Sequence, residues 1–142
     1  MFPLALAISA GQSTQLEHVM ANALTWFEIP TLDLDRAVRF YETVLGVRLK
    51  REIFGGVPHA LFPAGQTDAG GALIHDGRRK PSTDGTLIYL DAGGKLDAGV
   101  ERLKGAGGTV LLPKTDIGDP GFIAVFRDSE GNSVALHSPR NA

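Results

Sequence analysis

Residues 34–46 and 96–108 carry the same pattern, and this internal repeat constrains the fold more than any other feature of the chain. The first copy has apolar residues, an aspartate and a closing glycine at Leu34, Asp35, Val38, Tyr41 and Gly46. At one constant separation along the chain, the second copy has Leu96, Asp97, Val100, Leu103 and Gly108. Such duplication indicates two copies of one supersecondary unit, each of which must bury its apolar face against a neighbour.

The first copy has the signals of a capped amphipathic helix over residues 34–45. Asp33 and Asp35 can each accept hydrogen bonds from the free backbone amides of a helix N-terminus. Apolar residues follow at the spacing of one helix face, at Leu34, Ala37, Val38, Tyr41, Val44 and Leu45. Phe40 and Tyr41 are expected to pack the helix against a sheet, and Gly46 suits the left-handed turn that ends a helix.

Short apolar or alternating segments surround both copies and predict strands. The first copy has four of them, at residues 24–29, 47–53, 57–62 and 71–75. In the second of these, alternation assigns Val47, Leu49 and Ile53 to a buried face. The second copy has a strand at 86–91, a helix at 96–106 and strands at 109–112, 122–126 and 133–137.

The polar, turn-rich residues 77–85 are predicted to link two modules, residues 24–76 and 86–139. The fold class is therefore α+β. Two tandem βαβββ modules are expected to pair into a curled eight-stranded mixed sheet that encloses a cleft. A cleft between repeats is a natural site for a small ligand.

Residues 1–19 are set apart from a single domain at residues 20–142. The apolar run at residues 1–10 is far shorter than the roughly 20 residues that a membrane span needs. No Lys or Arg precedes it, which argues against a secretory signal. We expect a disordered extension or a start-site or expression artefact, with a processed signal or a dimer-bridging arm as the alternatives.

Charge and cysteine content exclude several classes of function. The 14 basic and 16 acidic side chains are interspersed, with a formal net charge of −2. Neither a nucleic-acid partner nor a membrane surface is therefore expected. The chain has no cysteine, which excludes a disulfide framework and thiolate chemistry and agrees with a cytoplasmic location.

Three segments carry a resemblance to a known family: residues 27–46, FEIPTLDLDRAVRFYETVLG, residues 96–114, LDAGVERLKGAGGTVLLPK, and residues 120–139, PGFIAVFRDSEGNSVALHSP. Over residues 24–139 the chain resembles the vicinal oxygen chelate superfamily, which includes glyoxalase I, bleomycin-resistance proteins and extradiol dioxygenases. The helix end at residues 40–46 and the turn at residues 128–132, with Asp128, Glu130, Gly131 and Asn132, carry most of it. These motifs are specific for the fold and for no single reaction.

The resemblance implies where a divalent ion would bind in metal-using relatives, which take His, Gln or Glu from the first and last strand of each module. The corresponding positions here are Trp26, a position near Leu87, Ala135, and either Ile74 or His75. Because three of the four carry no donor atom, no metal is expected. The alternative is a displaced divalent-metal site, for which the candidates are Glu28, His59, His75 and His137.

Without a metal, the cleft is expected to be lined by Trp26, Glu28, Tyr89, Phe126 and His137. Aromatic side chains can stack on a flat ligand, and one carboxylate can fix its orientation. Glu28 is the candidate catalytic base. The alternative is that these are core residues of the sheets, that Glu28 is a buried polar anchor, and that His137 hydrogen-bonds the backbone.

The leading hypothesis is a homodimeric, glyoxalase/bleomycin-resistance-like protein that binds a small aromatic or polar organic molecule between its modules. The resemblance implies a lyase, isomerase or dioxygenase with a displaced metal site as the alternative, so the sequence leaves enzymatic activity open. A plain scaffold domain has no positive sign in the sequence.

Overall fold

The computed structural model describes residues 22–141, and the predicted α+β fold with two βαβββ modules is confirmed. The extension predicted at residues 1–19 lies outside the described residues. The first module contains β1 (Trp26–Pro30), α1 (Leu34–Leu45), β2 (Lys50–Phe54), β3 (Val57–Leu61) and β4 (Gly70–Ile74). The second contains β5 (Tyr89–Asp91), α2 (Leu96–Leu103), β6 (Thr109–Asp116), β7 (Phe122–Arg127) and β8 (Ser133–Ser138).

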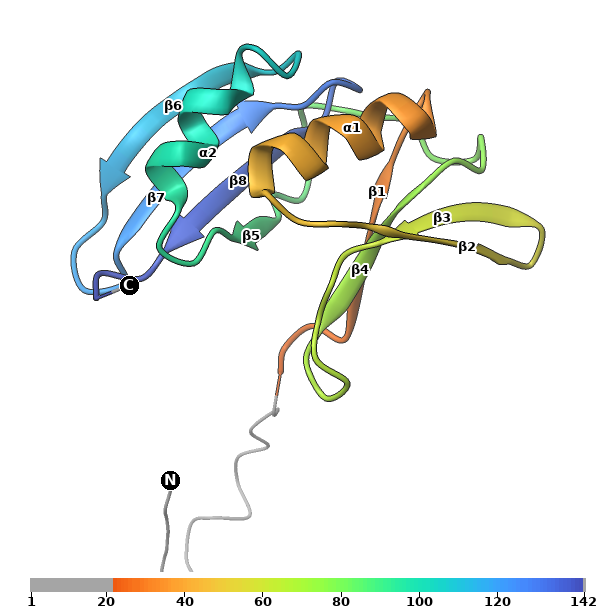
Figure 1. Ribbon diagram of the computed structural model, residues 1–142, viewed down its shortest axis with the longest axis horizontal. Coiled ribbons are helices and arrows are strands. Elements are labelled where there is room, and N and C mark those ends of the chain that lie inside the picture. Colours follow the sequence, from red (N-terminus) through yellow and green to blue (C-terminus); the bar gives the residue numbers. More distant parts are fainter. Residues whose placement is uncertain (1–21, 142) are drawn as a thin grey trace, which may run out of the picture.

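The two modules have the same strand topology, as the internal repeat predicts. Their sheets have the orders β1-β4-β3-β2 and β5-β8-β7-β6, so each first strand pairs with the last strand of its own module. That pairing is parallel in both sheets, and the other pairs are antiparallel. The hydrogen-bonded ladders form two separate four-stranded sheets. Figure 1 shows them on either side of the molecule, with α1 and α2 next to each other.

Helix α1 has the predicted bounds, and its caps explain them. The Asp33 side chain accepts a hydrogen bond from the Arg36 amide, at 3.1 Å between N and Oδ1. At the other end Gly46 has a φ of 68°, a left-handed conformation that glycine adopts at little cost, and its amide donates to the Glu42 carbonyl. The predicted inner face is buried at Ala37, Val38, Phe40, Tyr41 and Val44.

Several predicted boundaries differ from the structure. Strand β2 starts at Lys50 rather than residue 47, and Ile53, predicted to be buried, is 71% exposed. The β2–β3 hairpin extends away from the helices in Figure 1, in agreement with the exposure of Ile53. In the second module, α2 ends at Leu103 rather than residue 106, β5 has only three residues, and β6 continues to Asp116.

Aromatic side chains of α1 connect the two sheets. The Tyr41 ring lies 5.6 Å from the Phe62 ring of the first module and 6.3 Å from the Phe126 ring of the second. The Phe40 ring contacts both Tyr41 and Phe126, at centroid distances of 4.9 and 5.8 Å. Because Phe40, Tyr41 and Phe126 are at most 1% exposed, α1 forms one hydrophobic core common to both modules.

The turn between β7 and β8 ties the second module to the start of the first by hydrogen bonds. The Glu130 carboxylate accepts from the amides of Leu32 and Asp33, both at 2.8 Å, and from the Arg36 guanidinium at 2.8 and 3.1 Å. The Tyr41 hydroxyl donates to Asp128 at 2.6 Å. The Asn132 amide donates to the Pro30 carbonyl at 2.9 Å. We call Asp128, Glu130 and Asn132 the inter-module turn.

These contacts explain two perturbed pKa values. Burial would raise the pKa of Glu130, but the hydrogen bonds from Arg36, the Asp33 amide, Ser129 and the Leu32 amide outweigh it and hold the pKa below its ordinary value. Burial, and after it the negative charge of Asp128, raises the pKa of Tyr41 well above its ordinary value, so this phenol stays protonated and donates.

Within residues 22–141 no helix is long and apolar enough to cross a membrane.

Replacing Glu130 tests the inter-module turn. Glu130→Gln should lower the free energy of unfolding at pH 7 by about 2 kcal/mol, because a fully covered carboxylate with several donors loses its charge. Urea denaturation measures this, with the exposed Glu101→Gln on α2 as the matched control. The folded pKa of Glu130 lies below the ordinary 4.5, so its contribution is present above about pH 4.5 and is lost as the pH falls through the folded pKa. An unfolding free energy of Glu130→Gln equal to wild type at pH 7 would contradict this role.

Candidate functional site

Strand β1 presents one face to the core and the other to the open side of the first sheet. Alternation along the strand places Ile29, 2% exposed, in the core. Trp26 and Glu28 project from the opposite face, as predicted, and both are exposed. Glu28 is opposite Ala72 of β4 in the strand register, and His59 of β3 is opposite Ile74 of the same strand. Side chains from three strands therefore meet on this face.

Glu28, His59 and Trp26 form the polar centre of this face. The His59 Nε2 atom lies 3.7 Å from Glu28 Oε2, and the Trp26 Nε1–H donates to the same oxygen at 3.3 Å. His59 is 8% exposed and its ring packs edge-on against Phe54 at a centroid distance of 4.9 Å. The Glu28 side chain is 40% exposed, so the alternative interpretation of it as a buried anchor is wrong.

The hydrogen bond on the far side of the His59 ring defines what the ring presents to Glu28. His59 Nδ1 lies 2.8 Å from the Val57 carbonyl oxygen, which can only accept, so Nδ1 carries the proton. A neutral His59 therefore directs the lone pair of Nε2 toward the Glu28 carboxylate. Two acceptors that face each other at this distance suit a shared proton, a bridging water or a donor group of a ligand.

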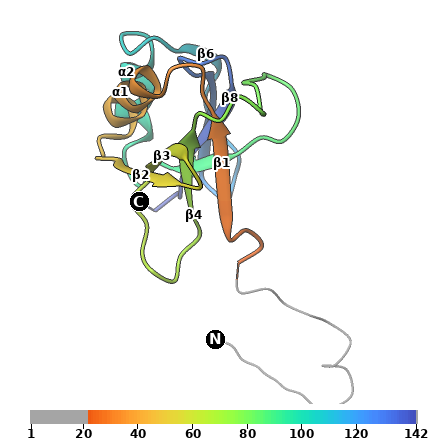
Figure 2. The same cartoon turned by 90° about the vertical axis from the view of Figure 1, so that its right-hand side faces the viewer.

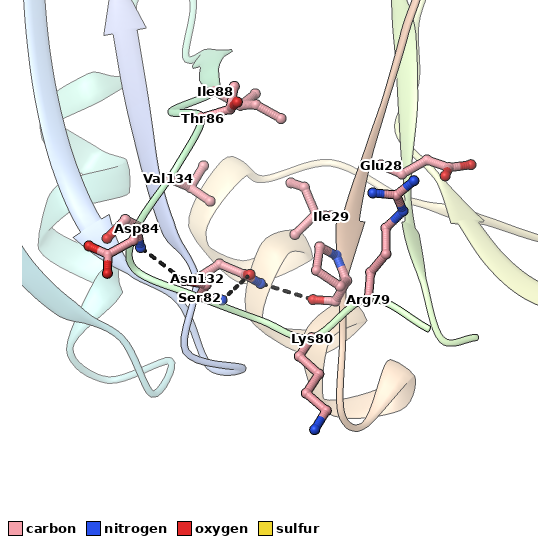
Figure 3. A pocket seen from close by; sticks show the side chains of 12 residues that line it. Glu28, Ile29, Arg79, Lys80, Ser82, Asp84, Thr86, Ile88, Asn132 and Val134 are labelled. Carbon is pink, nitrogen blue, oxygen red and sulfur yellow. Dashed lines mark hydrogen bonds between the residues drawn. The ribbon is translucent and has the colours of Figure 1, made fainter. Parts of the chain in front are cut away.

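A cavity of about 300 Å³ opens beside Glu28 between the two modules. It is lined by β1, by the linker between the modules and by the start of β8. Figure 3 shows Glu28 at one side, Asn132 and Val134 at the other, and linker residues across the opening. A second hollow, about 320 Å³, adjoins it over His59 and Phe54 and also includes Glu28. A third, of about 320 Å³, is lined by Glu28 with Asp76, Arg78 and Arg79, so Glu28 stands where three hollows meet.

The linker that borders this cavity is held at both ends. Asp76 accepts a hydrogen bond from the Arg78 amide at 2.8 Å. Backbone hydrogen bonds from Arg78 and, after the opposing effect of burial, from Arg79 lower the pKa of Asp76. At the other end, the Ser82 amide donates to the Asn132 side chain at 3.2 Å, and the Ser133 amide donates to the Ser82 carbonyl. Figure 2 shows the linker as a green loop that leaves the sheets and returns to them.

The structure separates the five residues that the sequence predicted to line one cleft. Trp26 and Glu28 lie together, but Tyr89 lines a different, more apolar hollow of about 280 Å³ with Leu24 and Phe27. Phe126 is a correction: it is fully buried against α1, because its side chain projects from the core face of β7. Its neighbour Val125, opposite Ala135 in the register, has the open face instead.

The four residues proposed for a displaced metal site are not brought together either. His75 Nδ1 lies 3.0 Å from the Thr31 carbonyl, and His137 Nε2 lies 2.7 Å from the Pro120 carbonyl in the second sheet. The alternative interpretation of His137, a hydrogen bond to the backbone, is therefore correct. In residues 22–141 no group of three or more His, Cys, Asp or Glu side chains is placed to hold an ion. Glu28 and His59 alone supply two donors, which is too few for the sites that metal-using members of the resembled superfamily build.

The linker side chains Arg79, Lys80 and Ser82 and the cavity residue Asn132 were not predicted as site residues from the sequence. One signal was present: residues 78–80 are three consecutive basic residues in a linker between two modules. Only the fold places them beside Glu28. The sequence identified Asn132 only as part of the turn at residues 128–132, whereas in the structure its side chain also accepts a hydrogen bond from the linker.

The chain has clear relatives by sequence. A family model described as the Glyoxalase/Bleomycin resistance protein/Dioxygenase superfamily matches residues 15–136. A Mycobacterium bovis protein named "Putative glyoxylase CFP32" is 29% identical over 119 residues, which are 83% of this chain and 44% of that protein. The chain thus spans less than half the length of this curated relative.

Solved structures share the fold. A glyoxalase/bleomycin resistance protein from Albidiferax ferrireducens T118 has a TM-score of 0.64 at 19% identity, over 82% of this chain and 98% of that one. TnmS3, an antibiotic binding protein from Streptomyces sp. CB03234, has a TM-score of 0.57 at 24% identity, over 86% of this chain and 99% of that one. At these identities the similarity is evidence for the fold alone.

The two-donor arrangement leads to a prediction about metal binding. Incubated separately with Mn, Fe, Co, Ni and Zn salts and then desalted, the protein should retain far less than one ion per chain, because Glu28 and His59 have no third donor among the described residues. Elemental analysis measures the ratio. Retention of about one ion per chain that is lost in Glu28→Ala would overturn the metal-free interpretation of the site.

Proposed function

The chain belongs to the Glyoxalase/Bleomycin resistance protein/Dioxygenase superfamily, and on that premise we propose that it binds a small organic molecule between its modules without a divalent ion. The observation that carries the proposal is the position of Glu28. Glu28 lines three neighbouring hollows, and its Oε2 atom accepts a hydrogen bond from the Trp26 indole and lies 3.7 Å from His59 Nε2. An aromatic surface next to a few converging polar groups is the usual composition of a small-molecule site.

The size and lining of the cavity support a ligand of modest size. Its volume of about 300 Å³ lies at the lower end of the range of small-molecule pockets. Ile29, Ile88 and Val134 supply apolar walls, while Ser82 and Asn132 supply polar groups. TnmS3 is described as an antibiotic binding protein, so ligand binding on this fold has a precedent among the structural neighbours.

An enzymatic role is the second candidate, and the His59–Glu28 contact favours it. A histidine whose tautomer is set by the Val57 carbonyl, 3.7 Å from a carboxylate, is an arrangement that can accept and return a proton. A lyase, isomerase or dioxygenase reaction would also need an electrophile or a metal, for which the described residues provide no complete donor set. Binding without turnover therefore remains our proposal.

We also propose that the protein acts as a cytoplasmic homodimer. Ile53 and Phe54, at the end of the β2–β3 hairpin, are 71% and 50% exposed. Large apolar side chains at a projecting hairpin are suited to contact with another copy of the chain. Sedimentation of the purified protein at several concentrations would test the oligomeric state.

Trp26 provides the measurement that tests ligand binding. It is the sole tryptophan, it is 44% exposed, and its indole N–H bonds Glu28. In a screen of small aromatic and polar molecules, ligands should shift its fluorescence, and Glu28→Ala should weaken binding by about tenfold through loss of a charge-assisted hydrogen bond. The exposed Glu101→Ala on α2 is the control.

Two results would count against the proposal. A flat fluorescence response to the whole screen, confirmed by calorimetry, would remove the ligand site. Turnover that Glu28→Ala and His59→Ala both abolish would replace it by the enzymatic candidate.

A further inference from the structure

We propose that the ligand is an organic anion with a hydrogen-bond donor next to its anionic group, and that Arg79 selects it by binding that group. This inference rests on the proposed function and names the class of molecule that the same cavity accepts. Three features of the molecule support it: where Arg79 points, how its loop is held, and which oxygen of Glu28 accepts no hydrogen bond from the described residues.

The Arg79 side chain extends from the linker toward Glu28. Figure 3 shows the Arg79 side chain running beside β1, with its guanidinium turned toward the Glu28 side chain. The two groups do not form an ion pair within 4.0 Å, and among residues 22–141 no carboxylate lies within that distance of Arg79. A guanidinium beside a cavity without an ion partner presents several donors in a planar fork that matches a carboxylate.

Its two basic neighbours are arranged differently. Arg78 already has an acidic partner, since its Nε atom lies 3.7 Å from Asp76. Lys80 lines the cavity through its stem, but in Figure 3 its ammonium points away from Glu28. Arg78 also lines the adjoining hollows with Glu28, but it is paired with Asp76. Of the three consecutive cations, Arg79 is thus the one that lines the cavity with its guanidinium turned toward Glu28 and with no described carboxylate within 4.0 Å.

The backbone on both sides of Arg79 is held by hydrogen bonds within the protein. Before Arg79, Asp76 accepts a hydrogen bond from the Arg78 amide at 2.8 Å. After it, the Ser82 amide donates to the Asn132 side chain and the Ser82 carbonyl accepts from the Ser133 amide. Only Lys80 and Pro81 separate Arg79 from Ser82, and proline has a restricted backbone. A ligand therefore orders one side chain and not a whole loop, which reduces the entropic cost of binding.

Glu28 accounts for the second part of the ligand. Trp26 and His59 both approach its Oε2 atom, at 3.3 and 3.7 Å. Its Oε1 atom accepts no hydrogen bond from the described residues. A hydroxyl or ammonium group can donate to this oxygen while a neighbouring carboxylate pairs with Arg79. A ligand that has both a carboxylate and a neighbouring donor can therefore pair with Arg79 and with Glu28 at the same time.

The test uses matched sets of probes on the full chain. Each set has a 2-hydroxy acid, its amide and the acid without the hydroxyl: 3-phenyllactate, 3-phenyllactamide and 3-phenylpropionate, and the same set built on 2-hydroxy-4-methylpentanoate. Trp26 fluorescence and calorimetry measure the dissociation constants. The wild-type protein should bind at least one hydroxy acid about tenfold or more tightly than its amide and than its deoxy analogue.

The variants assign that preference to residues. Arg79→Gln should remove the preference for the acid over the amide, whereas Lys104→Gln, which removes a positive charge at an exposed position after α2, should retain it. Glu28→Gln should remove the preference for the hydroxyl and leave much of the preference for the acid. Thermal unfolding should be unchanged in Arg79→Gln, because that side chain has no ion pair among the described residues.

Three outcomes would overturn the inference: equal binding of acid and amide by wild type, an acid preference that survives Arg79→Gln, or no binding of any acid at all. In each case a neutral molecule found in the wider fluorescence screen, with binding weakened by Glu28→Ala, would leave the proposed function intact. If the wider screen also finds no ligand, both the inference about Arg79 and the proposed ligand-binding function are wrong.

Discussion

The arrangement of the two modules depends on one buried carboxylate. Glu130 lies in the turn before the last strand, yet four of its hydrogen bonds come from the start of α1 in the other module. The two backbone amides among these donors, of Leu32 and Asp33, lead into the helix, where free N–H groups favour a negative charge. A carboxylate removed from water is stable only when donors surround it, so its burial requires that α1 and the turn meet in this orientation.

The same turn also shapes the candidate site. Asn132 donates to the Pro30 carbonyl at the end of β1 and accepts from the Ser82 amide in the linker. One amide side chain therefore joins three walls of the cavity: the strand that carries Glu28, the linker that carries Arg79, and the start of β8. The cavity is a consequence of how the modules are tied together and is not a pocket of either module alone.

The sequence predicted the fold well wherever the signal was local. Helix α1 has the expected bounds because Asp33 and Gly46 provide local caps at its two ends, although Glu130 adds a distant contact at the first of them that the sequence did not reveal. Ile53 was misjudged because alternation indicates a face but not whether anything covers it. The prediction that Phe126 lines the cleft was wrong by a single residue of register, which moves a side chain to the other face of its strand. The position of Arg79 could not be predicted, because its linker is held by the contact of the Arg78 amide with Asp76 and by the contact of Ser82 with Asn132, far along the chain.

Strand β1 links the stability of the molecule to its chemistry. Ile29 anchors the strand in the shared core, the Pro30 carbonyl accepts from the inter-module turn, and Glu28 faces the cavity from the residue before them. Three successive residues thus serve the core, the contact between modules and the site. Because a strand is stiff over so short a distance, the Glu28 carboxylate is positioned by the same interactions that hold the modules together.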